Sequence, residues 1–193
     1  MKRCSTAQLR PRNFPTSDRL PVFTIGHSTR SIADFAEILR GGAVRLVVDV
    51  RTVPRSRTNP QYNADVLGGE LAPWQVGYRP IAGLGGLRGR ARDVPPDVNG
   101  YWENQSFHNY ADYALSPAFG SALDELIALA ADTPTAIMCS EAVWWRCHRR
   151  IIADYLLARG IPVLHLMGNS RIDPARITPA AEERDGHLVY PAP

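Results

Sequence analysis

The chain has 193 residues, of which 45% are apolar, and carries a formal net charge of +3 at pH 7. This length supports one domain with a packed core and is short for two, and so small a charge excess does not by itself point to a nucleic-acid partner. The three cysteines are unevenly spaced, which argues against a disulfide framework, and no run approaches the roughly 20 apolar residues of a membrane span. We therefore expect a cytoplasmic protein without a membrane partner.

Residues 1–20 are polar and basic, and we expect them to form a mobile tail. Two strongly apolar, β-branched runs at 22–25 and 44–50 predict buried strands. Between them, Ser31 is placed to cap a helix that ends at a pair of glycines. Strand, helix and strand in this order predict a βαβ unit.

The next stretch, residues 51–109, is punctuated by proline and glycine and is predicted to be a long, largely irregular insertion. Within it, residues 64–71 have the pattern of a short helix and residues 78–81 that of a short strand. Insertions this long inside a compact domain are usually functional loops or lids. We therefore expect this one to contribute to a site.

Regular structure is expected again after the insertion. The pattern predicts a helix opening at residue 109, a helix from 117 to 130, a buried strand over 135–139, a helix ending before Gly160, and a buried strand over 161–167.

Strands alternating with helices indicate a doubly wound α/β fold, in which a mainly parallel sheet carries helices on both faces. A single domain is expected over residues 21–193. Its last part, residues 170–193, is a C-terminal extension in which 186–190 is expected to form an edge strand.

Polar residues stand at the carboxyl ends of three predicted strands: His27 and Ser28, Asp49 and Arg51, and Cys139 and Glu141. Ligands of such sheets bind outside the carboxyl ends of the strands, where the strand order switches. The sequence therefore predicts that these side chains share one functional cleft.

Five separated segments carry a family resemblance. They are TIGHS at 24–28, DVR at 49–51 with Pro54 and the pair Ser56 and Arg57, LGGLR at 84–88, YADY at 110–113, and MC-x-E at 138–141 followed by CHR at 147–149. In this order they resemble the DUF488 family of small bacterial and archaeal proteins, over about residues 22–168. Because that family is a domain of unknown function, the resemblance implies an α/β fold and a shared site without a reaction. Trp144 and Trp145 add bulk before CHR that departs from the pattern and bears on the shape of the cleft.

Two cysteines are candidate reactive thiols. Cys147 is expected in the first turns of a helix, where the helix dipole and flanking arginines would lower the pKa of its thiol. Cys139 ends a buried strand, and buried cysteines are often structural. Glu141, between an apolar strand and two tryptophans, needs a partner, so a general base and an ion pair with Arg149 or Arg51 both fit.

Two histidines have different settings. His27 follows a strand directly and is placed for acid–base work. His148 shares a predicted helix face with apolar residues, so a core histidine bonded to a backbone carbonyl fits as well as a catalytic one. Asp49 and Arg51 lie on one side of their strand, where they either bind each other or leave Arg51 and Arg57 to clamp an anion.

A phosphate or other anion site has the most support. Arginines follow two strand ends, helix N-termini are expected at the same edge, and the Gly-rich basic run 83–92 contains Arg88. A cysteine phosphatase or rhodanese-like loop fits less well, because the stretch between Cys139 and Arg146 is one residue too long and contains Glu141.

A metal site formed by Cys139 and Cys147 with His27 or His148 has suitable ligand types. However, Cys147 and His148 would point about 100° apart on a helix of 3.6 residues per turn, which argues against joint binding of one ion. No metal ligands are therefore predicted, and the sequence does not identify a cofactor.

We predict an enzyme of the hydrolase or transferase class that binds a phosphate-bearing ligand such as a nucleotide or a nucleic-acid end. The alternatives are a non-catalytic nucleic-acid-binding module that uses the Arg/Gly-rich insertion, and a metal-dependent hydrolase. The candidate catalytic residues are Cys139, Glu141, Cys147, His27 and His148, and the candidate binding residues are Ser28, Asp49, Arg51, Arg57, Arg88 and Arg149.

Overall fold

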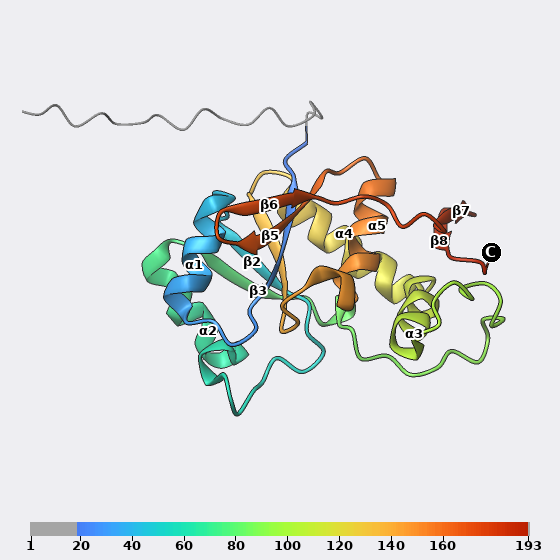
Figure 1. Ribbon diagram of the computed structural model, residues 1–193, viewed down its shortest axis with the longest axis horizontal. Helices are drawn as coiled ribbons and strands as arrows, with labels where there is room; N and C mark the ends of the chain where they lie inside the picture. Colours follow the sequence, from blue (N-terminus) through green and yellow to red (C-terminus); the bar gives the residue numbers. More distant parts are fainter. Residues whose placement is uncertain (1–18, 193) are drawn as a thin grey trace, which may run out of the picture.

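The structure, a computed structural model, describes residues 19–192 (Figure 1). The predicted mobile tail, residues 1–20, lies outside the described part except for Arg19 and Leu20.

A six-stranded sheet forms the centre of the molecule, in the order β3-β2-β4-β1-β5-β6. The first five strands of the chain pair in parallel, and only β6 runs antiparallel, to β5. The predicted α/β fold with a mainly parallel sheet is confirmed. The strands are β1 (Val22–Gly26), β2 (Leu46–Asp49), β3 (Gly77–Pro80), β4 (Thr135–Cys139), β5 (Val163–Gly168) and β6 (Arg171–Pro174).

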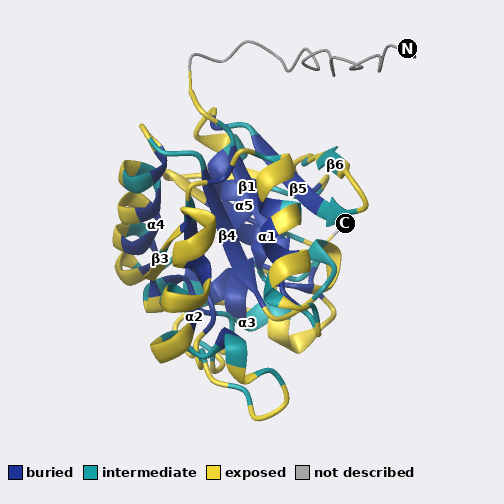
Figure 2. Ribbon diagram, turned by 90° about the vertical axis from the view of Figure 1, so that its left-hand side faces the viewer, coloured by how far each residue is buried: buried dark blue, intermediate teal, exposed yellow. Residues whose placement is uncertain are grey.

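Helices cover both faces of this sheet, as Figures 1 and 2 show. They are α1 (Ile32–Gly41), α2 (Ala64–Leu71), α3 (Gln105–Ala114), α4 (Pro117–Ala130) and α5 (Arg149–Ala158). None of the helices in the described part combines the length and the apolarity needed to cross a membrane.

The alternation of side chains along each strand decides which helices pack on which face. In β4, Ala136 and Met138 belong to the core cluster that contains α1 and α2, whereas Ile137 and Cys139 belong to the cluster that contains α3, α4 and α5. Cys139 therefore lies on the same side of the sheet as α5, where Cys147 and His148 precede the helix.

Side-chain caps fix where two of the helices begin. The Ser31 hydroxyl accepts the Asp34 amide at 3.1 Å, and α1 starts where the sequence predicts it. Asn104 caps α3 by accepting the amides of Ser106 and Phe107, so this helix begins at Gln105 and not at the predicted residue 109. The earlier start brings Ser106 to the edge of the cleft described below.

Within the insertion over residues 51–109, the expected short helix and short strand form as α2 and β3. The strand β3 pairs in parallel with β2 and so extends the central sheet. At the C-terminal end, the expected strand at 186–190 forms as β8 (His187–Val189), but it pairs with β7 (Glu182–Arg184) in a separate two-stranded sheet and is not an edge of the main one.

The strand order changes direction around β4 and β1. From β1 the chain passes to β2 on one side, and from β4 it passes to β5 on the other. Connections that leave in opposite directions open a crevice at the carboxyl ends of the strands between them. The loops after β1, β2 and β4 meet there.

Gly26 lets the loop after β4 lie directly against the end of β1. A Cβ atom at this position would lie 2.0 Å from the Glu141 carbonyl oxygen and 2.8 Å from the Cα of Ala142. The same two segments are joined by backbone hydrogen bonds from His27 to Cys139 and from Ser28 to Ser140.

Replacing Gly26 with alanine is expected to lower the free energy of unfolding by at least about 1–3 kcal/mol, because backbone atoms must move to admit the new methyl group. Gly41→Ala is the matched control, since a Cβ there meets nothing within 4 Å. It should leave stability unchanged or raise it by up to about 1 kcal/mol. Urea unfolding of both variants measures the difference, and equal effects would contradict the close contact.

Candidate functional site

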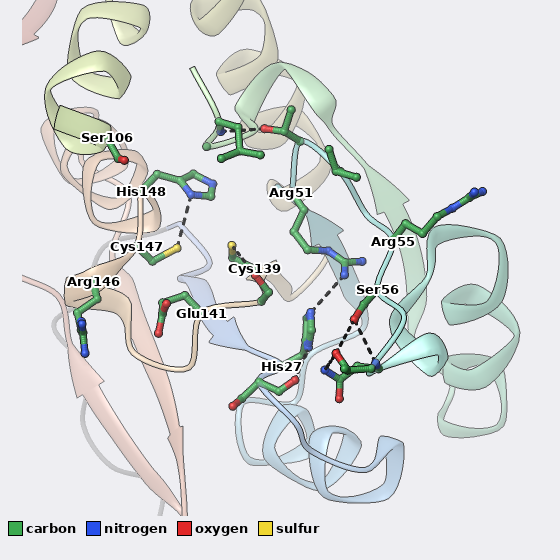
Figure 3. Close-up of a pocket in the computed structure, with 18 of the residues that line it drawn as sticks. His27, Arg51, Arg55, Ser56, Ser106, Cys139, Glu141, Arg146, Cys147 and His148 are labelled. Atoms are coloured by element: carbon green, nitrogen blue, oxygen red, sulfur yellow. Dashed lines mark hydrogen bonds between the residues drawn. The ribbon is translucent and has the colours of Figure 1, made fainter. Parts of the chain in front are cut away.

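A cleft of about 600 Å³ lies at the carboxyl edge of the sheet (Figure 3). It is lined by the residues that follow β1, β2 and β4, by residues 86–87 of the insertion, and by the first turn of α3. The structure places all five candidate catalytic residues on its lining, together with Ser28 and Arg51. Four candidate binding residues do not line it: Asp49, Arg57, Arg88 and Arg149.

Asp49 and Arg51 bind each other beneath one wall of the cleft. The Nη2 of Arg51 donates to Asp49 Oδ2 at 2.6 Å, its Nε donates to Oδ1 at 2.9 Å, and both side chains are buried. The Tyr78 hydroxyl donates to the same carboxylate at 2.8 Å. Of the two roles the sequence left open for Arg51, mutual binding is the one the structure contains.

His27 completes this network and has no ring nitrogen free for the cleft. Its Nε2 lies 3.2 Å from Arg51 Nη1, and its Nδ1 lies 2.8 Å from the Ser28 carbonyl oxygen. A guanidinium only donates and a carbonyl only accepts, so the neutral ring carries its proton on Nδ1. Burial lowers the pKa of His27 to about 4, which keeps the ring neutral at pH 7. The geometry makes His27 a support for Arg51.

Arg149 organises the loop between β4 and α5. It is 1% exposed, its Nε lies 3.2 Å from Cys147 Sγ, and its Nη2 donates to the backbone carbonyl of Glu141. The carboxylate of Glu141 is exposed and makes no hydrogen bond or ion pair with any described residue. The ion pair that the sequence suggested between Glu141 and Arg149 or Arg51 is therefore replaced by a contact to the main chain.

The sequence predicted Cys147 in the first turns of a helix, but the structure places it before the helix begins. A 3₁₀ turn over Trp144–Arg146 precedes it, its own backbone is extended at φ −135° and ψ 146°, and α5 begins two residues later. Burial alone would raise the pKa of the Cys147 thiol. A hydrogen bond from Cys139 and the charge and hydrogen bonds of Arg149 outweigh burial and lower this pKa to about 6.

Cys139 and His148 complete the floor of the cleft. The hydrogen bond with Cys147, together with burial, raises the pKa of Cys139. His148 Nε2 lies 2.9 Å from the Val50 carbonyl oxygen, which confirms the carbonyl-bonded histidine that the sequence allowed. This bond places the proton on Nε2, so the lone pair of Nδ1 faces Cys147 Sγ at 3.5 Å.

Three ligand atoms of metal-binding type converge on this floor. The two cysteine sulfurs and one nitrogen of His148 all lie within 4.8 Å of one another. The prediction that Cys147 and His148 point too far apart to share an ion is wrong, because the backbone at Cys147 is extended and not helical. These three residues have the donor types and the proximity to hold a metal ion.

The arginines are divided between the interior and the cleft. Arg88 turns inward, donating to the carbonyls of residues 82, 83 and 85 and lying 3.7 Å over the ring of Tyr113. Arg55 and Arg146 line the cleft instead. Arg57 was predicted to bind the ligand and Arg55 was not, because the direction of a side chain in an irregular loop leaves no periodic signal in the sequence.

The aromatic residues of the insertion pack with one another. Trp102 is buried, stacks on Phe107 at 5.0 Å, and contacts Tyr190 edge-on at 5.2 Å. Arg90 and Arg92 border a separate hollow over residues 90–96. No aromatic side chain lines that hollow, so within the described insertion Arg90 and Arg92 do not share a groove with aromatic residues that could stack on bases, and the nucleic-acid-binding alternative is not favoured.

The fold and the cleft define an α/β protein with a candidate active site at the carboxyl edge of a mainly parallel sheet. The model of the family described as "Domain of unknown function DUF488" matches residues 31–156, which is more than half of the chain. The protein belongs to the DUF488 family, as the sequence resemblance indicated. The comparisons with curated proteins and with solved structures gave no match.

Asp49→Asn is expected to lower the free energy of unfolding by about 3–5 kcal/mol, because it leaves the buried guanidinium of Arg51 without a counter-charge. Tyr78→Phe removes one hydrogen bond to the same carboxylate and should cost only about 1–2 kcal/mol. Urea unfolding compares the two variants. A smaller loss in Asp49→Asn than in Tyr78→Phe would contradict the ion pair.

Stability is expected to fall as the pH is lowered from 6.5 toward 4. Burial lowers the pKa of both His27 and His165 from an ordinary 6.5 to about 4, so the unfolded chain takes up protons in this window and the folded chain does not. The contribution of the two neutral rings is fully present above pH 6.5 and is lost toward pH 4, by a few kcal/mol in order of magnitude.

Unfolding free energies at pH 7, 5.5 and 4.5 measure this slope. His165→Gln should flatten it, whereas the control His187→Gln, at an exposed position, should not. Identical slopes in wild type and His165→Gln would contradict the assignment.

Proposed function

We propose that the protein is an enzyme of the hydrolase or transferase class. It binds a phosphate-bearing substrate in the cleft, and the reaction takes place at the floor of the cleft. One observation carries the proposal. Arg55 and Arg146 line the cleft and are exposed, and their guanidinium groups make no hydrogen bond or ion pair with any described residue.

The contrast with the other arginines gives this observation its weight. The guanidinium groups of Arg51, Arg88 and Arg149 donate to acceptors of the protein itself. Arg55 and Arg146 stand on opposite sides of the cleft (Figure 3), where their guanidinium donors are available to phosphate oxygens. Their two positive charges exceed the single negative charge of Glu141 on the same lining, so the cleft attracts anions.

Hydroxyl groups and backbone strain support the same conclusion. Side-chain hydroxyls of Ser28, Ser56, Ser106 and Ser140 line the cleft and suit phosphate and sugar oxygens. Ser28 has φ +49°, a conformation that non-glycine residues rarely adopt and that clusters at functional sites.

The cleft also offers apolar surface to the rest of the substrate. Val53 is 61% exposed and Leu87 is 74% exposed, and both line the cleft. Exposed aliphatic side chains beside phosphate-binding arginines fit a ligand that joins a flat apolar base to phosphate. A nucleotide or the end of a nucleic-acid strand is such a ligand, and the opposite positions of the arginines favour one with charge along its length.

The reaction is placed at the floor, where Cys139, Cys147 and His148 meet. The unpartnered carboxylate of Glu141 lines the same cleft and is the candidate general base. His27 takes no proton-transfer role, because both of its ring nitrogens are engaged.

Binding of the 5′-phosphorylated dinucleotide pApA, measured by isothermal titration calorimetry, tests the substrate class. Arg55→Ala and Arg146→Ala should each weaken binding about tenfold or more, since each removes a charge-assisted contact to phosphate. Arg57→Ala is the matched control, because Arg57 is also exposed and lies two residues away but does not line the cleft. Equal losses in Arg55→Ala and Arg57→Ala would contradict a phosphate site in the cleft.

Turnover is tested by incubating the protein with nucleotides and short oligonucleotides and identifying the products by mass spectrometry. Glu141→Gln and Cys147→Ser should abolish product formation, with pApA still bound by Glu141→Gln. If wild type binds these ligands but forms no product, the protein is a binding module, and the proposal that it is an enzyme is contradicted.

A further inference from the structure

The floor of the cleft has the composition of a metal centre. Its ligand atoms are two cysteine sulfurs and one histidine nitrogen, a set that zinc uses in sites with one open position. We propose that Cys139, Cys147 and His148 bind one Zn²⁺-type divalent ion, with its fourth position open to the cleft.

The distances fit such an ion with small adjustments. In a tetrahedral site with Zn–S of about 2.3 Å and Zn–N of about 2.0 Å, neighbouring ligand atoms are roughly 3.5–3.8 Å apart. Cys147 Sγ and His148 Nδ1 are already 3.5 Å apart, and no two of the three atoms are more than 4.8 Å apart. Rotations of the cysteine side chains therefore suffice to close the site.

His148 is prepared for coordination through its other nitrogen. Its Nε2 proton is bonded to the Val50 carbonyl, which leaves the lone pair of Nδ1 directed toward the sulfurs. Metal-bound histidines almost always donate their second N–H to a backbone carbonyl or a carboxylate in this way. Gly86 maintains the position of the ring, since a Cβ at Gly86 would lie 2.3 Å from Nδ1.

The open position faces the substrate. All three ligand residues line the cleft, and no fourth histidine, cysteine or carboxylate of the described chain joins the group. A protein ligand in the fourth position is typical of structural zinc, whereas an open one is typical of catalytic zinc.

The local charge would favour hydroxide at that position. Coordination would release the thiol protons to solvent, two thiolates would neutralise the divalent ion, and the buried guanidinium of Arg149 beside Cys147 would leave one positive charge in excess. A water in the open position would then make the group neutral by losing a proton to Glu141 or to solvent. This role for the ion rests on the proposed function, whereas binding of the ion does not.

The test begins with the full chain stripped of metal and titrated with Zn²⁺ and with Co²⁺. We expect one ion per chain by elemental analysis and a sulfur-to-cobalt charge-transfer band in the near ultraviolet. Cys139→Ser, Cys147→Ser and His148→Ala should each lower Zn²⁺ affinity at least 100-fold in competition with a chromophoric chelator. Cys4→Ser and His187→Ala, the latter at an exposed position, are the controls and should bind as wild type does.

Two further measurements do not depend on removing a ligand. Gly86→Ala, which displaces the His148 ring, should weaken Zn²⁺ binding, whereas Gly89→Ala, where a Cβ meets nothing within 4 Å, should not. In wild type, Zn²⁺ should protect Cys139 and Cys147 from iodoacetamide, with modification located by mass spectrometry.

The outcomes separate this inference from the proposed function. Wild type that binds no ion at micromolar Zn²⁺, or whose two cysteines are not protected, overturns the metal site even if pApA still binds through Arg55 and Arg146. If wild type binds one ion tightly but does not bind pApA, the metal site is supported and the proposal of a phosphate-bearing substrate is rejected.

Discussion

The floor of the cleft depends on one buried guanidinium. Arg149 stands at the first position of α5 with 1% exposure, and a buried guanidinium is stable only when acceptors surround its N–H groups. The main-chain carbonyl of Glu141 and the sulfur of Cys147 are two of these acceptors. The loop after β4 must therefore return across the start of α5, and this path brings Cys147 and His148 beside Cys139.

The buried guanidinium of Arg51 holds the opposite wall of the cleft in place in the same way. Arg51 is satisfied by Asp49, by the Tyr62 carbonyl and by His27, so the loops after β1 and β2 are fixed to each other. Both buried arginines donate to acceptors of the protein itself. Arg55 and Arg146, on the same two loops, are exposed instead and line the cleft, so arginines with structural contacts and arginines that face the cleft lie close in sequence.

Local pattern was sufficient for most of the fold. The strands β1 and β4 are mainly apolar in sequence and buried at every residue, and the short helix expected over residues 64–71 forms as α2 with the same bounds. The strand β6 was missed because it is only four residues long, two of these residues are charged, and none of the four is fully buried. Polar residues at three strand ends also located the cleft, because parallel strands bring their carboxyl ends to one edge regardless of the loops.

The roles of individual side chains could not be predicted in the same way, because they depend on contacts between distant residues. The sequence around Cys147 has helical spacing, yet its backbone is extended because Arg149 engages Glu141 and His148 engages Val50, which lies 98 residues away. Because the backbone at Cys147 is extended and not helical, Cys147 and His148 can direct their ligand atoms toward one ion. Sequence periodicity assigns an element, whereas the direction of a side chain beside an element boundary is decided by whichever buried polar group must be satisfied there. Functional sites at strand-to-helix junctions concentrate such groups, and it is there that inference from local pattern is least secure.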